Sequence, residues 1–133
     1  EAKYAWCGFI TEVHVEYLEF LQQLRPRFRL SVLSNTNPFI QGWARSPQFT
    51  PCHKSLDDYF DSLFLSYCMK CSKPGEEIYR KMLADGSMVA AETLFIDDSD
   101  RNLETAASVG IRTLKVENGE DWRGKLMHFL QCD

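Results

Sequence analysis

The chain has 133 residues, 44% of them hydrophobic and 26% charged, which suits one globular domain and excludes a disordered or fibrous chain. The net charge of −4 gives no basic surface for nucleic acid, and no apolar run approaches the ~20 residues that span a bilayer, so we expect neither partner. The five cysteines, an odd number, argue against a disulfide framework and favour a reducing cytoplasm.

Helical and strand patterns alternate along the chain. Apolar residues recur at helical spacing over residues 11–24, and Pro26 marks the end of this helix because the residue before a proline avoids the helical region. The apolar run Leu30–Ser34 predicts a buried strand. Further strands are predicted at 62–66, 93–97 and 113–116, and further helices at 39–44, 56–60, 74–83, 101–109 and 121–130. This alternation predicts a parallel sheet with helices on its faces.

Polar side chains follow three of the predicted strands at their carboxyl ends, where open parallel sheets bind ligands. Ser34 and Asn35 close the first strand, and Lys73 follows the second just before its helix. Asp97 and Asp98 end the third strand. We therefore expect a hydroxyl, an ammonium group and two carboxylates on one edge of the sheet. This set suits phosphoryl transfer, because carboxylates bind Mg²⁺ and a lysine neutralises phosphate charge.

Three segments resemble motifs of the haloacid dehalogenase superfamily, in matching order and spacing. Residues 30–37 (LSVLSNTN) resemble its second motif, and residues 72–79 (SKPGEEIY) resemble its third. Residues 95–99 (FIDDS), followed by Asn102, resemble its fourth. The resemblance implies a Rossmann-like three-layer α/β/α core with a parallel sheet over residues 11–133. It also implies a capped phosphatase that uses Mg²⁺ and an aspartyl-phosphate intermediate to hydrolyse a small phosphorylated substrate, with sugar phosphates as the leading class.

The resemblance also assigns roles to the residues at the strand ends. Ser34, with Asn35 beside it, would bind the transferring phosphoryl group. Lys73 would bridge that group and a nucleophilic carboxylate. Asp97 and Asp98 would serve the Mg²⁺ ion, and the sequence leaves open which of them binds the metal directly.

The superfamily's first motif, Asp-x-Asp-x-Thr/Val after an N-terminal strand, does not occur before Ser34. Its first Asp is the nucleophile, and its strand lies mid-sheet between the strands that end at Ser34 and Asp97. We interpret residues 1–10 as the tail of the helical cap, so we expect the central strand and most of the cap to be absent. Because the sequence opens on Glu1 rather than Met, we expect a missing N-terminal segment of the same protein to complete the sheet. We expect this fragment alone to be inactive.

Two other functions stay open. A catalytically inactive binding or regulatory module of the same superfamily would explain the absent nucleophile. A phospho-receiver domain also combines Asp, Ser or Thr, and Lys around Mg²⁺, but its acidic pair comes first along the chain, whereas here the acids follow Lys73. Dehalogenation is disfavoured because it needs no metal and would leave Asp97 and Asp98 idle.

The resemblance to the superfamily does not assign a role to two further features. Cys68 and Cys71 have the Cys-x-x-Cys spacing of zinc and redox sites, but no second pair accompanies them, so free thiols near a strand end are the simpler interpretation. Phe39 and Trp43 follow Ser34 closely, and we expect them to line the route to the site.

Overall fold

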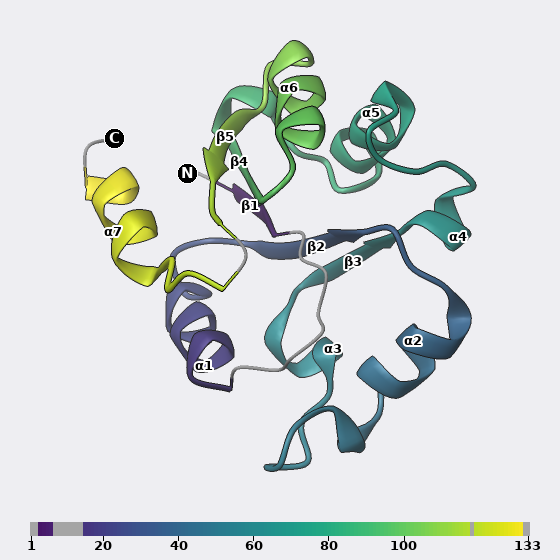
Figure 1. The fold of residues 1–133 in the computed structure, drawn as a ribbon, viewed down its shortest axis with the longest axis vertical. Helices are drawn as coiled ribbons and strands as arrows, with labels where there is room; N and C mark the ends of the chain where they lie inside the picture. Colours follow the sequence, from purple (N-terminus) through teal and green to yellow (C-terminus); the bar gives the residue numbers. More distant parts are fainter. Residues whose placement is uncertain (1–2, 7–14, 118, 132–133) are drawn as a thin grey trace.

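The fold is built on one parallel sheet (Figure 1). The computed structural model describes residues 3–6, 15–117 and 119–131. In this part of the chain five strands pair in the order β3-β2-β1-β4-β5, and every pairing is parallel. The strands are β1 (Lys3–Trp6), β2 (Leu30–Ser34), β3 (Ser62–Leu65), β4 (Thr93–Asp97) and β5 (Arg112–Lys115).

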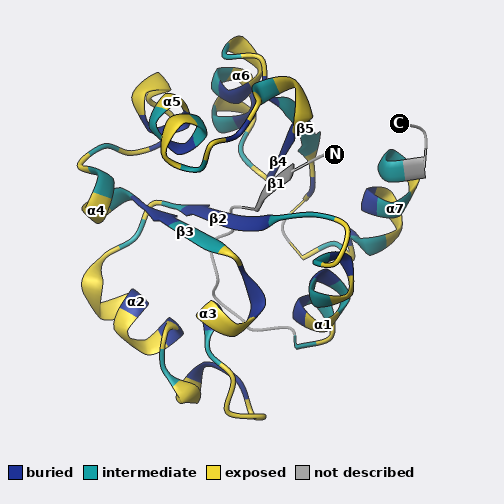
Figure 2. Cartoon of the chain, turned by 180° about the vertical axis from the view of Figure 1, so that it is seen from behind, coloured by how far each residue is buried: buried dark blue, intermediate teal, exposed yellow. Residues whose placement is uncertain are grey.

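Helices cover both faces of the sheet. They are α1 (Val15–Leu24), α2 (Pro38–Ala44), α3 (Leu56–Tyr59), α4 (Ser66–Met69), α5 (Glu76–Asp85), α6 (Asp100–Ser108) and α7 (Arg123–Gln131), with 3₁₀ turns at Pro47–Phe49 and Ala90–Glu92. Helices α1, α3 and α7 contribute to one buried apolar cluster, and α5 and α6 contribute to a second cluster on the other face. The predicted three-layer α/β/α architecture is therefore confirmed, and Figure 2 shows the buried strand β2 between helices whose outer surfaces are exposed.

Alternating side chains of the inner strands supply both clusters. In β4, Leu94 and Ile96 pack in the first cluster while Phe95 packs in the second. Successive strand residues point to opposite faces, so a strand covered on both sides reads as a continuous apolar run. Fully burying one such side chain contributes about 1.5–3 kcal/mol relative to leaving it in water. The predicted site residues Ser34 and Asp97 are the last residues of β2 and β4.

Most predicted elements form close to their expected bounds, and one helix was missed. Strands β2 and β4 have the predicted limits, and α5 begins at Glu76, two residues later than predicted. The helix that was missed, α4, is a single turn directly after β3, and Lys70 ends it with a left-handed backbone (φ 58°). One turn carries too few residues to show a helical period, so α4 could not be predicted from the residue pattern.

The central strand of the sheet was expected to be absent. This expectation is wrong, because Lys3–Trp6 occupy the position between β2 and β4. These residues form β1 and pair with both β2 and β4, with Ala5 opposite Ser31 on one side and Phe95 on the other. The main chains of β2 and β4 thus have a neighbour, which avoids unpaired backbone groups between them. Residues 7–10, the rest of the segment interpreted as the tail of a cap, lie outside the described residues. No helix in the described ranges is long and apolar enough to cross a membrane.

Candidate active site

The carboxyl ends of the strands bring Lys73 and Asp97 together. Asp97 is the last residue of β4, and Lys73 lies in the loop between α4 and α5. The Lys73 Nζ atom lies 3.6 Å from Asp97 Oδ2. The expected meeting of a lysine and a carboxylate from distant segments is therefore confirmed.

This ion pair is withdrawn from water. The side chains of Lys73 and Asp97 are 5% and 4% exposed. Burial lowers the pKa of Lys73 below its ordinary value, while the charges of Asp97 and Asp98 oppose that shift. Burial also raises the pKa of Asp97, against the opposing effects of the Lys73 charge and a hydrogen bond from Asn102. Each partner therefore offsets part of the other's desolvation cost.

Two further donors fix the orientation of the Asp97 carboxylate. The side-chain Nδ2 of Asn102 donates to Oδ2 at 2.8 Å, and the backbone N–H of Asp98 donates to Oδ1 at 2.7 Å. Asn102 lies in the first turn of α6, whose N-cap, Ser99, accepts a hydrogen bond from the Asn102 backbone N–H. From the sequence, Asn102 was expected only as part of the fourth motif, without a role of its own. Its five-residue distance from Asp97, across a strand-to-helix turn, was the available signal.

A buried tyrosine, Tyr79, is hydrogen-bonded to the main chain of Asn102. The Tyr79 hydroxyl donates to the Asn102 carbonyl oxygen at 2.9 Å, and the Tyr79 ring packs edge-on against Phe95 with centroids 5.4 Å apart. Burial, and secondarily the Asp97 charge, raise the pKa of Tyr79 well above its ordinary value, so its hydroxyl remains a donor. In the sequence, Tyr79 was noted only as the last residue of the segment 72–79 that resembles the third motif.

Replacing Tyr79 with phenylalanine is expected to lower the free energy of unfolding by about 1–2 kcal/mol, because the Asn102 carbonyl loses its donor. Urea denaturation measures this loss. Tyr59→Phe is the matched control, because Tyr59 is equally buried but its hydroxyl contacts the Cys52 sulfur at 3.7 Å, and sulfur is a weak hydrogen-bond partner. Equal losses in the two variants would contradict the special role of the Tyr79 hydroxyl.

The other predicted site residues differ in how they relate to this pair. Asn35 lies beside Lys73: its Oδ1 accepts from the Lys73 backbone N–H at 2.9 Å, and its Nδ2 donates to the Lys73 carbonyl at 3.0 Å. Ser34, the last residue of β2, is half-buried, and Asp98 is exposed. The assignment of these residues to phosphate and metal binding stays a prediction.

Asp97 and Asp98 are neighbours in the chain and offer two carboxylates, the first buried and the second exposed. Within the described ranges, no group of three or more His, Cys, Asp or Glu side chains could hold a metal ion. Two carboxylates fit Mg²⁺, which usually binds one or two carboxylates and completes its shell with waters and phosphate oxygens. They do not fit the four-ligand cage of structural zinc. Cys68 and Cys71 are free thiols.

The aromatic residues after Ser34 differ in their surroundings. Phe39 is 93% exposed. Trp43 packs edge-on against Phe49, with ring centroids 5.2 Å apart, and is 42% exposed. Trp43 therefore serves partly to anchor α2, and the role of the two residues in lining a route to the site stays a prediction.

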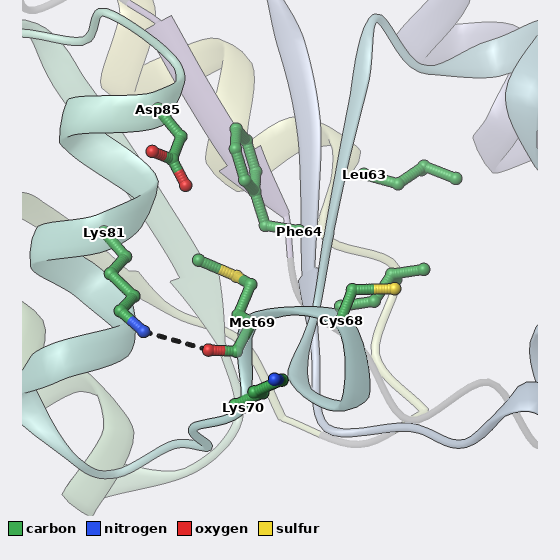
Figure 3. Close-up of a pocket in the computed structure, with 8 residues that line it drawn as sticks. Leu63, Phe64, Cys68, Met69, Lys70, Lys81 and Asp85 are labelled. Carbon is green, nitrogen blue, oxygen red and sulfur yellow. Dashed lines mark hydrogen bonds between the residues drawn. The ribbon is translucent and has the colours of Figure 1, made fainter.

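A separate hollow of about 550 Å³ lies beside the edge strand β3 (Figure 3). Lys81 of α5 points across it and donates to the Met69 carbonyl at 3.0 Å. Neither Lys73 nor Asp97 borders this hollow, so it is distinct from the ion-pair site. Its lining residues are Leu63, Phe64, Leu65, Cys68, Met69, Lys70, Lys81 and Asp85.

Comparison with known proteins identifies the family. A family model described as haloacid dehalogenase-like hydrolase matches residues 16–116. The D-ribitol-5-phosphate phosphatase of Bacteroides thetaiotaomicron is 43% identical over 126 residues, which are 95% of this chain and 61% of that protein. The chain belongs to the haloacid dehalogenase-like hydrolase family.

Solved structures agree with this assignment. A HAD-like family hydrolase from Porphyromonas gingivalis has a TM-score of 0.88 at 41% identity, over 93% of this chain and 60% of that one. A HAD family enzyme from Bacteroides thetaiotaomicron, in complex with magnesium and inorganic phosphate, has a TM-score of 0.75 at 36% identity, over 83% of this chain and 56% of that one. The chain thus spans about 60% of the length of these relatives.

Proposed function

We propose that the intact protein is a Mg²⁺-dependent phosphatase that hydrolyses a small phosphorylated metabolite through an aspartyl-phosphate intermediate. The observation that carries this proposal is the buried contact of Lys73 with Asp97 at the carboxyl ends of the strands. Asp98 adjoins the pair, and its exposure leaves it accessible to a metal ion. The relative from Bacteroides thetaiotaomicron that bears a phosphatase name supports the reaction type. The similar enzyme in complex with magnesium and inorganic phosphate supports the choice of metal.

The residues of this chain would act by binding and electrostatics. An aspartate attacks phosphorus, the alcohol leaves, and water then hydrolyses the acyl phosphate, which divides one difficult step into two. The Ser34 hydroxyl donates a hydrogen bond to a phosphoryl oxygen. The Lys73 ammonium group offsets the negative charge shared by the phosphoryl group and the nucleophile. When bound by Asp97 and Asp98, Mg²⁺ supplies further positive charge to the phosphoryl oxygens.

The nucleophile would come from a segment of the same protein outside these 133 residues. Residues Lys3–Trp6 contain no carboxylate. In the described sheet their position is the one adjacent to both β2 and β4, the strands that end at Ser34 and Asp97. We infer that in the intact protein a strand carrying an Asp-x-Asp pair takes the place of Lys3–Trp6 between β2 and β4. On this basis the 133-residue chain alone is inactive.

The substrate class would be sugar or polyol phosphates. This choice is supported by the name of the relative from Bacteroides thetaiotaomicron, a D-ribitol-5-phosphate phosphatase, at 43% identity. A single phosphate ester also matches the site, in which one buried lysine and one hydroxyl are available to the phosphoryl group.

A screen of the intact protein against sugar and polyol phosphates tests this function. Phosphate release is measured with Mg²⁺, after chelation, and after Mg²⁺ is added back. Release is expected to fall at least about 100-fold on chelation and to recover fully, because two carboxylates alone cannot supply the missing positive charge. Turnover that is indifferent to chelation would contradict the metal assignment. Binding of Mg²⁺ and inorganic phosphate without any turnover would favour the inactive binding module.

A further inference from the structure

The side chain of Asn35 makes two reciprocal hydrogen bonds with the main chain of Lys73. Asn35 Oδ1 accepts from the Lys73 N–H at 2.9 Å, and Asn35 Nδ2 donates to the Lys73 carbonyl at 3.0 Å. The two residues are 38 positions apart in the chain. A carboxamide can make both bonds because it carries an acceptor and a donor side by side. The pairing fixes the main chain of Lys73 relative to the end of β2.

A second reciprocal pair lies one residue further along. The Thr36 N–H donates to Ser66 Oγ at 2.9 Å, and Ser66 Oγ donates to the Thr36 carbonyl at 3.2 Å. This pair joins the end of β2 to the first residue of α4 and does not include Lys73. Breaking the Thr36–Ser66 pair therefore controls for breaking the Asn35–Lys73 pair, because both consist of two hydrogen bonds just after β2.

The position of the Lys73 main chain decides where its ammonium group lies. A lysine side chain is a flexible four-carbon stem with about 2 kcal/mol of rotamer entropy. Here the side chain is 5% exposed, lies over the Phe95 ring at 5.8 Å and ends 3.6 Å from Asp97. With the stem confined in this way, a shift of the main chain moves the ammonium group with it. Asn35, which is itself exposed, contacts the main chain of Lys73, at the opposite end of the lysine from its ammonium group.

We propose that Asn35 is a positioning residue, whose side-chain amide fixes the Lys73 main chain and so directs the ammonium group, instead of binding the phosphoryl group. This inference rests on the proposed phosphatase function and amends the role expected from the sequence. The Asn35 oxygen and one N–H already contact Lys73. One N–H of the amide is left for any other partner.

Kinetics of the intact protein separate positioning from phosphate binding. Asn35→Ala is expected to lower kcat about 10- to 100-fold, as small misplacements of catalytic groups do. The inhibition constant of inorganic phosphate should rise by less than kcat falls, because the Ser34 contact remains and a displaced ammonium group weakens the transition state more than a bound ground state. Ser66→Ala is expected to keep kcat within about threefold, since it breaks only the neighbouring pair. A parallel rise in the phosphate inhibition constant, or an equal loss of kcat in Ser66→Ala, would overturn the proposal.

Amide hydrogen exchange tests the contact without relying on activity. Exchange of the Lys73 N–H should accelerate in Asn35→Ala and stay slow in Asn35→Asp, which keeps the acceptor oxygen. Unchanged exchange in Asn35→Ala would overturn the proposal. An inactive wild-type protein whose Lys73 exchange still depends on Asn35 would contradict the phosphatase function and leave the contact itself established.

Discussion

Replacing Lys73 with methionine is expected to lower the free energy of unfolding by about 3–5 kcal/mol, because removing one partner of a buried ion pair leaves the other charge uncompensated. The Asp97 side chain is 4% exposed, and within the described residues it would keep its hydrogen bonds from Asn102 and the Asp98 backbone but lose its cationic partner. Methionine preserves most of the volume of the lysine stem, so the loss reports the charge and not a cavity. Urea denaturation at pH 7 gives the measurement.

The double variant Lys73→Met/Asp97→Asn is expected to recover at least half of that loss, since neither charge then remains buried. Lys81→Met is the matched control. Lys81 pairs with Glu77 at 3.3 Å and donates to the Met69 carbonyl at 3.0 Å, and at a side chain that is 42% exposed we expect these contacts to contribute about 0–1.5 kcal/mol. If Lys73→Met loses no more stability than Lys81→Met, the two charges are not buried together as described.

The second large effect concerns activity. In the intact protein, Asp98→Ala is expected to lower kcat/KM for a phosphorylated substrate at least about 1,000-fold, because the metal site would keep one carboxylate of two. Asp98 is exposed, so this substitution should leave the folded structure and its stability nearly unchanged. Initial rates of phosphate release across a range of Mg²⁺ concentrations measure the effect.

Asp100→Ala is the control for this experiment. Asp100 lies two residues on, is exposed, and pairs with Lys115 at 2.8 Å, so it carries a carboxylate of the same kind outside the site. Its replacement should change kcat/KM by less than about threefold, as for a surface substitution. Comparable losses in Asp98→Ala and Asp100→Ala would show that the acid after β4 has no special function.

Strands β2 and β4 could be predicted from sequence, because a strand that is buried on both faces is a continuous run of apolar residues. Strand β4 is a continuous apolar run closed by Asp97, and its predicted bounds are those of the structure. Strand β1 could not be predicted in this way. Lys3–Trp6 spans four residues, too few for periodicity to decide, and pairing with β2 and β4 determines its place.

Part of the site also followed from the sequence. Parallel strands align their carboxyl ends, so the order of the segments was enough to predict the contact of Lys73 with Asp97. The direction of each polar side chain was not predictable, because it depends on packing. Asn35 contacts the Lys73 main chain, and Tyr79 supports Asn102, through hydrogen bonds that motif spacing does not specify.

A crystal structure of the intact protein with Mg²⁺ and inorganic phosphate tests most directly whether these segments form one catalytic pocket. The metal ion is expected about 2.0–2.1 Å from a carboxylate oxygen of Asp97 or Asp98. Lys73 and Ser34 are expected within hydrogen-bond distance of the same phosphate. Metal and phosphate bound away from the Lys73–Asp97 pair, such as in the hollow beside β3, would contradict this.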